Sequence, residues 1–403
     1  MPHSRRWGIA AAGFILQVAL GAVYAWSVFR IPLSNEFGWS IPQVTLPFTI
    51  SIGVDSVACF VGGLWLGRSS PRVVALSGGV LYGLGVFLAG FSAHRLGWLY
   101  FSYGVLGGAG VGIAFIVPVS VLVKWFPDRR GLITGIAVAG FGSGALVTAP
   151  VAARLIETVG VMPTFRYLGI AFVLVATGAG FFMKNPPEGW QPAGWKPSSR
   201  QIRQRATRDF TLGQALARWQ WWALWALLFL NSSAGMALIS QEAPMFEKLA
   251  AVGAAVAGGM VGVVSIGNSA GRILWAWISD GLTRRWTLAI MFLLQCGLFW
   301  VLPSLVAAAM LGAVSFCILS CYGGGYGTIA AFAADYFGSR NVGAIYGLMG
   351  TAWGTAAAFG PLLLAHTVKA TGGYTRGLHL IAAMMAFSAL LPILISPPQP
   401  KHA

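Results

Sequence analysis

One arginine lies where a membrane segment should carry no charge. The stretch 253–279 is almost entirely apolar, and Arg272 is its only charged residue. If the edge of the apolar layer lies near Asp280, eight residues further on, Arg272 lies about 12 Å inside a layer about 30 Å thick. An arginine at that depth costs at least about 2.5–3.5 kcal/mol, so its guanidinium should face a polar cavity or a partner. Arg272 is therefore a candidate binding residue.

A guanidinium suits a small carboxylate, because it donates two parallel hydrogen bonds and stays charged at any relevant pH. Asn268 lies one helical turn before Arg272 on the same face and could hydrogen-bond either the substrate or the guanidinium. A few oriented polar groups in an apolar pocket fix a small ligand. The aromatic hydroxyls deep enough to do this belong to Tyr24, Tyr322, Tyr326 and Tyr346, although each taken alone is more often a packing residue.

Uptake of a single-charged anion also needs a coupling ion. The inside-negative potential opposes such an anion by about 2.3 kcal/mol per 100 mV, so a proton or a counter-anion must move as well. Asp55 lies twelve residues, about 18 Å, before the turn at Gly67 and is the first candidate proton carrier, with a structural hydrogen-bonded role as the alternative. Glu242, near the outer end of its segment, is the second candidate, unless it is a solvated residue at the mouth.

Composition indicates a membrane protein that crosses the bilayer many times. Of 403 residues, 57% are hydrophobic and 9% are charged, with a mean hydropathy of +0.74. The net charge of +16 comes from basic residues in short connections, which is typical of membrane topology and argues against a nucleic-acid partner. The four cysteines lie in apolar runs and are expected to pack, with no metal site. The chain shows no nucleophile–base set, metal cluster or phosphate loop, so we expect neither an enzyme nor a cofactor.

Twelve apolar runs are long enough to cross a bilayer, and runs of this length and composition form helices. They cover residues 7–29, 42–66, 72–92, 97–123, 131–153, 165–183, 219–246, 253–279, 286–303, 305–333, 342–367 and 376–396. The chain is thus predicted to be an all-α membrane protein of the inner membrane. Most lysines and arginines lie on the side of the amino terminus, which predicts that both termini are cytoplasmic.

The sequence divides into two similar halves of six helices. WFPDRRGLITG at 125–135 matches YFGSRNVGAIYG at 336–347, and GLWLGRSSPR at 63–72 matches AWISDGLTRR at 276–285. We therefore predict an amino-terminal half at 1–183, a cytoplasmic linker at 184–218 and a carboxy-terminal half at 219–403. The linker contains the basic run Arg200–Arg208, which is expected to anchor orientation at an anionic membrane surface.

Parallel six-helix halves with a basic middle loop resemble the major facilitator superfamily, in which the substrate site lies at mid-membrane and access alternates between the two sides. The turns after the second and eighth helices resemble the superfamily's motif of a glycine, an aspartate and basic residues. The residues matching it are Arg68, Arg72, Asp280, Arg284 and Arg285. The resemblance implies a cytoplasmic gate that ties neighbouring helices together in the outward-open state, weakened in the first half because Gly67 replaces the aspartate.

Further strings resemble the oxalate/formate antiporter family, which is related to the monocarboxylate transporters. They are GAVYAWSVFRIPL at 21–33, NPPEGWQPAGW at 185–195, DFTLGQAL at 209–216 and DYFGSRNVGAIYGLMGTAWG at 335–354. Both families bind substrate through an arginine on the eighth helix, which Arg272 matches. Monocarboxylate transporters have an aspartate where this chain has Asn268, and oxalate carriers have a lysine where this chain has Trp353. A dianion facing one cation would leave a charge unpaired, so one carboxylate is the better match.

Taken together, these features predict a secondary transporter of small monocarboxylates such as lactate, pyruvate, acetate or formate, driven by proton symport. The expected substrate contacts are Arg272, Asn268, Tyr322, Tyr326, Tyr24 and Trp353, and the expected proton carriers are Asp55 and Glu242. The expected partners are the carboxylate, the proton and the lipid bilayer, and the protein is expected to be a monomer. The alternatives are an antiporter of oxalate/formate type and, from another class, a membrane sensor that binds without transport.

Overall fold

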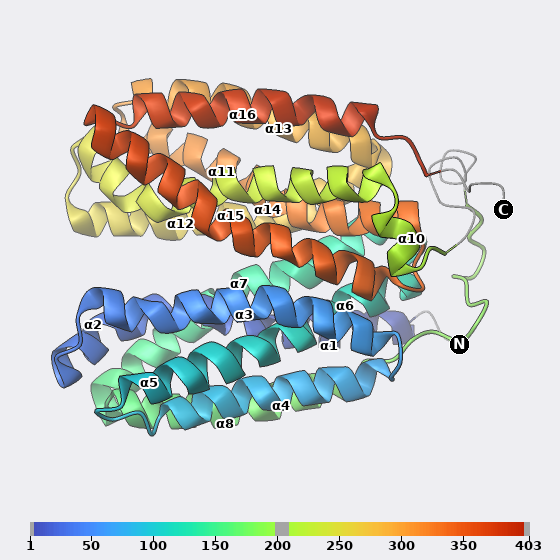
Figure 1. Cartoon of the computed structure of the whole chain (residues 1–403), viewed down its shortest axis with the longest axis horizontal. Coiled ribbons are helices and arrows are strands. Elements are labelled where there is room, and N and C mark those ends of the chain that lie inside the picture. Colours follow the sequence, from blue (N-terminus) through green and yellow to red (C-terminus); the bar gives the residue numbers. More distant parts are fainter. Residues whose placement is uncertain (1–3, 198–208, 399–403) are drawn as a thin grey trace. The chain divides into compact units, whose positions relative to one another are not determined.

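The computed structural model describes residues 4–197 and 209–398, and it is helical throughout these ranges, with no strand in them (Figure 1). The basic run Arg200–Arg208 of the predicted linker lies outside the described residues. Eleven helical segments in the described part of the chain are long and apolar enough to cross a membrane. The protein is therefore an all-α, multi-pass membrane protein, as its composition predicts.

The predicted spans and the observed helices agree to within a few residues at most ends. The first six spans are formed by α1 (Ser4–Leu20) with η1 (Gly21–Trp26) and α2 (Ser27–Phe37), by α3 (Ile41–Leu66), by α4 (Pro71–Ala89), by α5 (Leu96–Leu99) with η2 (Tyr100–Gly107) and α6 (Gly108–Trp125), by α7 (Arg130–Val159) and by α8 (Val161–Gly180). Several ends differ because helical hydrogen bonding continues past the apolar run into more polar residues, as in α2.

The short helix α10 (Leu212–Leu216) precedes the remaining helices. These are α11 (Trp219–Ala250), α12 (Ala254–Gly281), α13 (Arg284–Val301) with η3 (Leu302–Ser304), α14 (Ala308–Phe337), α15 (Val342–Thr371) and α16 (Thr375–Leu394). Of the twelve predicted spans, α12 alone is not among the eleven apolar segments. It is 28 residues long, and at about 1.5 Å per residue it is long enough to span a bilayer.

The described residues group into two compact units. The first holds the described parts of Met1–Asp128, Ile136–Ser198 and Ser339–Thr351, and the second those of Arg129–Gly135, Ser199–Gly338 and Ala352–Ala403. The units differ from the predicted halves at two places, because the start of α7 groups with the second unit and the start of α15 with the first. The division at 1–183, 184–218 and 219–403 stays a prediction.

In the first unit, helices approach closely through small residues. Helix α4 packs along α8, and α3 packs along α6 (Figure 1). A Cβ atom added at Gly108 would lie 2.6 Å from the carbonyl oxygen of Ser51, and one at Gly112 would lie 2.4 Å from that of Asp55. Two glycines four residues apart on α6 thus let its backbone lie directly against α3, as in other membrane helix pairs. This contact fixes the depth of Asp55 within the first unit.

In the second unit, α12 packs along α14 and α13 packs along α16 (Figure 1). The α12–α14 contact also depends on a glycine, because a Cβ atom added at Gly271 would lie 2.0 Å from the carbonyl oxygen of Ser320. Helix α11 packs against α14 as well, so α14 has neighbours along much of its length and is buried from Cys321 to Phe337.

The α3–α6 contact yields a stability prediction. Gly112→Leu should destabilise the protein by at least about 1–3 kcal/mol, because the new side chain meets backbone atoms that have nowhere to move. The control is Gly97→Leu in the same predicted span, where an added Cβ atom has no neighbour within 4 Å. Thermal unfolding of the purified protein in detergent measures both. Equal melting temperatures for the two variants would contradict the close contact.

Candidate substrate site

Arg272 is buried in the second unit with only 2% of its surface exposed. Its Nε donates a long hydrogen bond of 3.4 Å to Asn268 Oδ1, one turn earlier on α12. The centre of its guanidinium lies 5.0 Å from the centre of the Tyr326 ring, which is within range for a cation–π interaction. The arginine, the asparagine and one of the predicted tyrosines therefore meet at one place.

Two tyrosines of α14 form a chain of hydroxyl groups beside this arginine. The Tyr326 hydroxyl lies 2.9 Å from Ser232 Oγ on α11 and 3.2 Å from the Tyr322 hydroxyl. The Tyr322 hydroxyl in turn lies 3.5 Å from the sulfur of Met236. Both tyrosines are buried, and their four-residue spacing places them on one face of α14. The site thus combines one cation with two oriented hydroxyls.

Trp353 on α15 is also buried in the second unit, next to Tyr322. Its indole Nε1 makes no hydrogen bond of ordinary geometry with the described residues. The predicted ligand residue Tyr24 belongs to the first unit, where its ring packs on Phe141 at 5.2 Å and Phe48 at 6.5 Å between centres. Of the predicted substrate contacts, Arg272, Asn268, Tyr322 and Tyr326 therefore lie together in the second unit, whereas Tyr24 belongs to the first.

The glycine run of α14 has a packing reason. A Cβ atom added at Gly323 would lie 2.0 Å from the carbonyl oxygen of Asn268, and one at Gly327 would lie 2.9 Å from that of Arg272. Side chains at these positions would push α14 away from α12 and separate the tyrosines from the guanidinium. The run therefore serves close approach, and α14 continues as one helix through it.

Both predicted proton carriers are buried carboxyl groups. Asp55 on α3 is 6% exposed, and Glu242 on α11 is 1% exposed. Glu242 Oε1 has no hydrogen-bond partner among the described residues. The alternative interpretation of Glu242 as a solvated residue at the mouth is wrong in this structure. Both carboxyl groups are therefore shielded from water, and their role as proton carriers stays a prediction.

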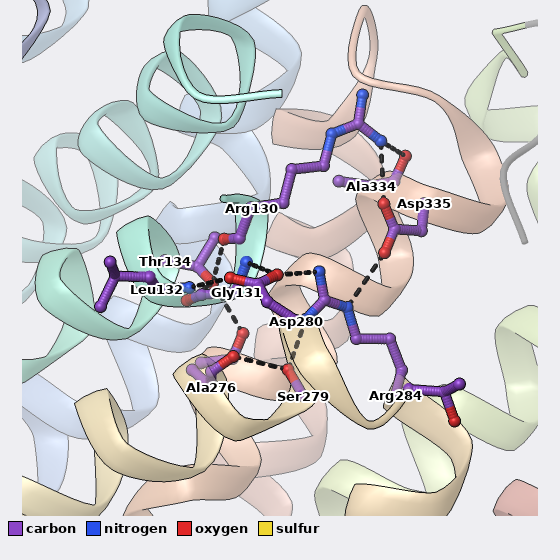
Figure 2. Close-up of polar contacts among 12 residues, drawn as sticks. Arg130, Gly131, Leu132, Thr134, Ala276, Ser279, Asp280, Arg284, Ala334 and Asp335 are labelled. Atoms are coloured by element: carbon purple, nitrogen blue, oxygen red, sulfur yellow. Dashed lines mark hydrogen bonds and ion pairs between the residues drawn. The ribbon is translucent and has the colours of Figure 1, made fainter. Parts of the chain in front are cut away.

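A cluster of charges lies at the end of α12, two turns beyond Arg272 (Figure 2). Asp280 accepts hydrogen bonds from the backbone N–H groups of Gly131 and Leu132, each 2.8 Å long. These groups belong to the first turn of α7, where unpaired N–H donors and the helix dipole favour a negative charge. The carboxylate of Asp280 therefore fixes the start of α7 against α12.

The same cluster contains two arginines and a second carboxylate (Figure 2). Arg284 pairs with Asp280 at 2.7 Å and with Asp335 at 3.0 Å, and it also donates to Ser279 Oγ. Arg130 pairs with Asp335 at 3.0 Å and donates to the carbonyl of Ala334. Each charge is buried against an opposite one, which is what burial of charge requires.

The other predicted gate residues lie outside this cluster. Arg285 donates to the backbone carbonyls of Pro392 and Ile393. Arg68 is exposed, and Arg72 lies over the ring of Phe181, in the first unit. Within the described residues, the gate motif of the second half is thus assembled around Asp280 and Arg284, whereas the first-half arginines take no part in it. The gating role of all five stays a prediction.

The start of α7 links the charged cluster to Arg272. Thr134 Oγ1 donates to the carbonyl of Gly327 on α14 at 2.8 Å. A Cβ atom added at Gly135 would lie 2.4 Å from the carbonyl oxygen of Arg272. One short segment, Arg130–Gly135, therefore contacts both the cluster and the backbone of the candidate binding residue.

Comparison with known proteins identifies the family. The family model described as "Major Facilitator Superfamily" matches residues 9–361, most of the chain. The chain belongs to the Major Facilitator Superfamily. As a member of this superfamily the protein is a transporter and not an enzyme. The crystal structure of the superfamily transporter FucP in the outward conformation has the same fold, with a TM-score of 0.72 and 13% identity over 96% of this chain and 97% of that one.

Two curated relatives cover most of the sequence. The uncharacterized MFS-type transporter YhjX of Escherichia coli (strain K12) is 30% identical over 348 residues, 85% of this chain and 84% of its own. The oxalate:formate antiporter of Oxalobacter formigenes is 27% identical over 390 residues, 95% of this chain and 90% of its own. The resemblance to oxalate/formate antiporters, and through them to monocarboxylate transporters, is confirmed.

Sequence reasoning missed two members of the charged cluster, Arg130 and Asp335. Both lie in or beside the repeated strings WFPDRRGLITG and YFGSRNVGAIYG. Each of the two residues is charged and lies at a helix end, on the same predicted side of the membrane. Charged residues of opposite sign at such positions beside the two repeated strings are the signal that could have found the pair.

The cluster yields a second stability prediction. Asp280→Asn should destabilise the protein by up to about 3–5 kcal/mol, because Arg284 loses one carboxylate and α7 loses the charge at its first turn. The exposed acid Glu36 supplies the control, Glu36→Gln, which should stay within about 0.5 kcal/mol of the parent.

Thermal unfolding of Asp280→Asn, Arg284→Gln and the double variant completes the test. The double variant should be less destabilised than the sum of the single ones, because the two residues interact directly. Strictly additive changes would show that the ion pair does not stabilise the second unit.

Proposed function

We propose that this protein is a secondary active transporter of small monocarboxylates such as lactate, pyruvate, acetate or formate. It lies in the cell inner membrane with both termini in the cytoplasm. Its two halves, 1–183 and 219–403, move about the linker 184–218 so that access to the site alternates between the two sides. A proton moves together with the substrate.

The observation that carries the proposal is the buried guanidinium of Arg272 beside Asn268 and Tyr326. A buried cation next to orienting hydroxyls suits a carboxylate, because the planar fork can donate two parallel hydrogen bonds to its two oxygens. Burial of so costly a charge in an apolar helix is expected where it serves function. Tyr322 and Tyr326 supply donors for a keto or hydroxyl oxygen of the same ligand.

Charge balance favours one carboxylate over two. The other buried arginine among the described residues of the second unit, Arg284, lies in the charged cluster near the end of α12 and is already engaged by two carboxylates. Trp353 takes the place of the lysine that the oxalate carriers have, so it adds an apolar wall and no second charge. A dicarboxylate would leave one negative charge unpaired in a medium of low dielectric constant. The substrate is therefore a monoanion with a small apolar or hydroxylated tail.

Exchange of oxalate for formate is the second candidate. The observation that favours it is the similarity to the oxalate:formate antiporter of Oxalobacter formigenes over 95% of this chain. The two functions differ in what must move with the anion. An exchanger needs an anion on the opposite side of the membrane and moves no proton, whereas a symporter works with empty vesicles and a pH gradient.

Transport by Arg272 variants tests the proposal in reconstituted vesicles. Arg272→Ala and Arg272→Lys should reduce uptake of labelled lactate or formate at least about a hundredfold, since the ion pair with the substrate is lost or loses its bidentate geometry. Ser265→Ala is the control on the same helix, because within the described part of the chain the Ser265 hydroxyl donates only to the α12 carbonyl of Val261. The control should transport like the parent protein.

The same vesicles separate the two candidate functions. With lactate or formate outside and none inside, an inward proton gradient should drive accumulation and the outside should become alkaline. Normal uptake by Arg272→Ala would show that Arg272 does not bind the substrate and that the site assignment is wrong. Uptake that requires internal oxalate or formate and moves no proton would replace symport with exchange.

Glu242→Gln and Asp55→Asn test the proton carriers. The variant of the true carrier should retain exchange of labelled for unlabelled substrate but lose accumulation driven by the proton gradient, because the amide cannot take up a proton. The other variant is the matched control and should still accumulate substrate. If both variants accumulate substrate uphill like the parent, the proton moves by another route and these two assignments are wrong.

A further inference from the structure

An apolar groove lies on the exposed face of the first unit, between α1 and α8. It has a volume of about 680 Å³, and small or aliphatic residues such as Ile9, Ala12 and Ala179 line it. Ile15 and Phe182 at its rim are 48% and 59% exposed. The groove is within the size range of pockets that hold small organic ligands. Its lining suits a hydrocarbon chain.

Two glycines keep the groove open. A Cβ atom added at Gly8 on α1 or at Gly178 on α8 would have no neighbour within 4 Å. These glycines therefore differ from Gly108 and Gly112, where helix packing forbids a side chain. Among the described residues, no helix contact requires a glycine at position 8 or 178. The absence of a side chain at these two positions therefore leaves space in the groove.

Two cations are among the residues that line the groove. Arg72 belongs to the first turn of α4, and Lys184 follows the end of α8. The centre of the Arg72 guanidinium lies 4.2 Å from the centre of the Phe181 ring, and its buried Nε has no hydrogen-bond partner. Within the described residues, no carboxylate pairs with either side chain. Arg6 on α1 differs, since it pairs with Asp128 at 2.8 Å.

We propose that this groove binds one anionic phospholipid, with its phosphate between Arg72 and Lys184 and an acyl chain along α1 and α8. The arginine fork matches a phosphate group, and the unpaired Nε supplies a donor that is already buried. Basic pockets between membrane helices on the cytoplasmic side bind anionic head groups, and that is the predicted side of these two residues.

The shape and charge of the groove select among possible occupants. A soluble phosphate would contact only Arg72 and Lys184 and would leave the apolar part of the groove unfilled. A zwitterionic lipid would bring its own positive charge next to Arg72 and Lys184. An anionic lipid alone satisfies both ends. The site is independent of the transported substrate, so it stands or falls separately from the proposed function.

Native mass spectrometry of the purified full-length protein in detergent tests the proposal, with phosphatidylglycerol and phosphatidylcholine as the added lipids. The parent protein should retain one phosphatidylglycerol in clear preference to phosphatidylcholine. The double variant Arg72→Gln, Lys184→Gln should weaken that retention about 25-fold, roughly fivefold for each basic residue near an anionic group. Gly178→Leu should weaken it as well, by filling the groove while leaving both charges in place.

Two control variants make the same kinds of substitution, a basic residue to Gln and a glycine to Leu, at positions outside the groove. Arg218→Gln removes a cation beside the start of α11, and Gly297→Leu adds a side chain on α13 where a Cβ atom has no neighbour within 4 Å. Both should retain phosphatidylglycerol like the parent. Melting temperatures within a few degrees of the parent, without added lipid, show that each variant is folded.

Three results would overturn the proposal. Equal retention by the double variant and the Arg218→Gln control would mean that the bound lipids are non-specific. Loss in the double variant with full retention in Gly178→Leu would mean that the cations bind a head group or free phosphate without the groove. A shift from dimer to monomer in Gly178→Leu, with lipid retention unchanged, would mean that a second copy of the chain covers the groove.

Discussion

A positive charge buried within the second unit constrains much of what surrounds it. Arg272 needs partners that can tolerate its charge, and α12 can bring it to Tyr326 only if α14 lies within backbone contact. The glycines of α14 make that contact possible, and they also remove the side chains that would otherwise fill the space. The start of α7 packs on the Arg272 backbone from another side. The need of Arg272 for close partners thus explains why α14 and the start of α7 carry glycines where they contact α12.

Periodicity and depth explain what could be predicted from the sequence. The spans were predictable to a few residues, because the cost of exposing polar backbone to lipid leaves few alternatives to a helix. The pairing of Arg272 with Asn268 and the alignment of Tyr322 with Tyr326 follow from a spacing of four residues on a helix. Features that depend on one element at a time were therefore within reach.

Features that depend on contacts between elements were not. The motif spacing gave Arg68, Arg72, Arg284 and Arg285 similar standing, yet Arg284 alone reaches Asp280, because its neighbours across the fold decide where each side chain goes. Asp335 lies 51 residues from Arg284 along the chain, and no local pattern links them. The complete burial of Glu242 likewise depends on helices packed around α11, which hydropathy along one segment does not report.

The acidic residues of the charged cluster have no equivalents in the first copy of the repeat. The alignment of the repeated strings puts Lys124 at the position of Asp335 and Gly67 at the position of Asp280. If the chain arose by duplication, an ancestor with two identical halves would have had this cluster twice or not at all. At these two positions the repeated strings of the present chain differ in charge, so the two copies are not interchangeable at the cluster. A protein built from two copies of one half would therefore not reproduce the charges that meet in the cluster of the present chain.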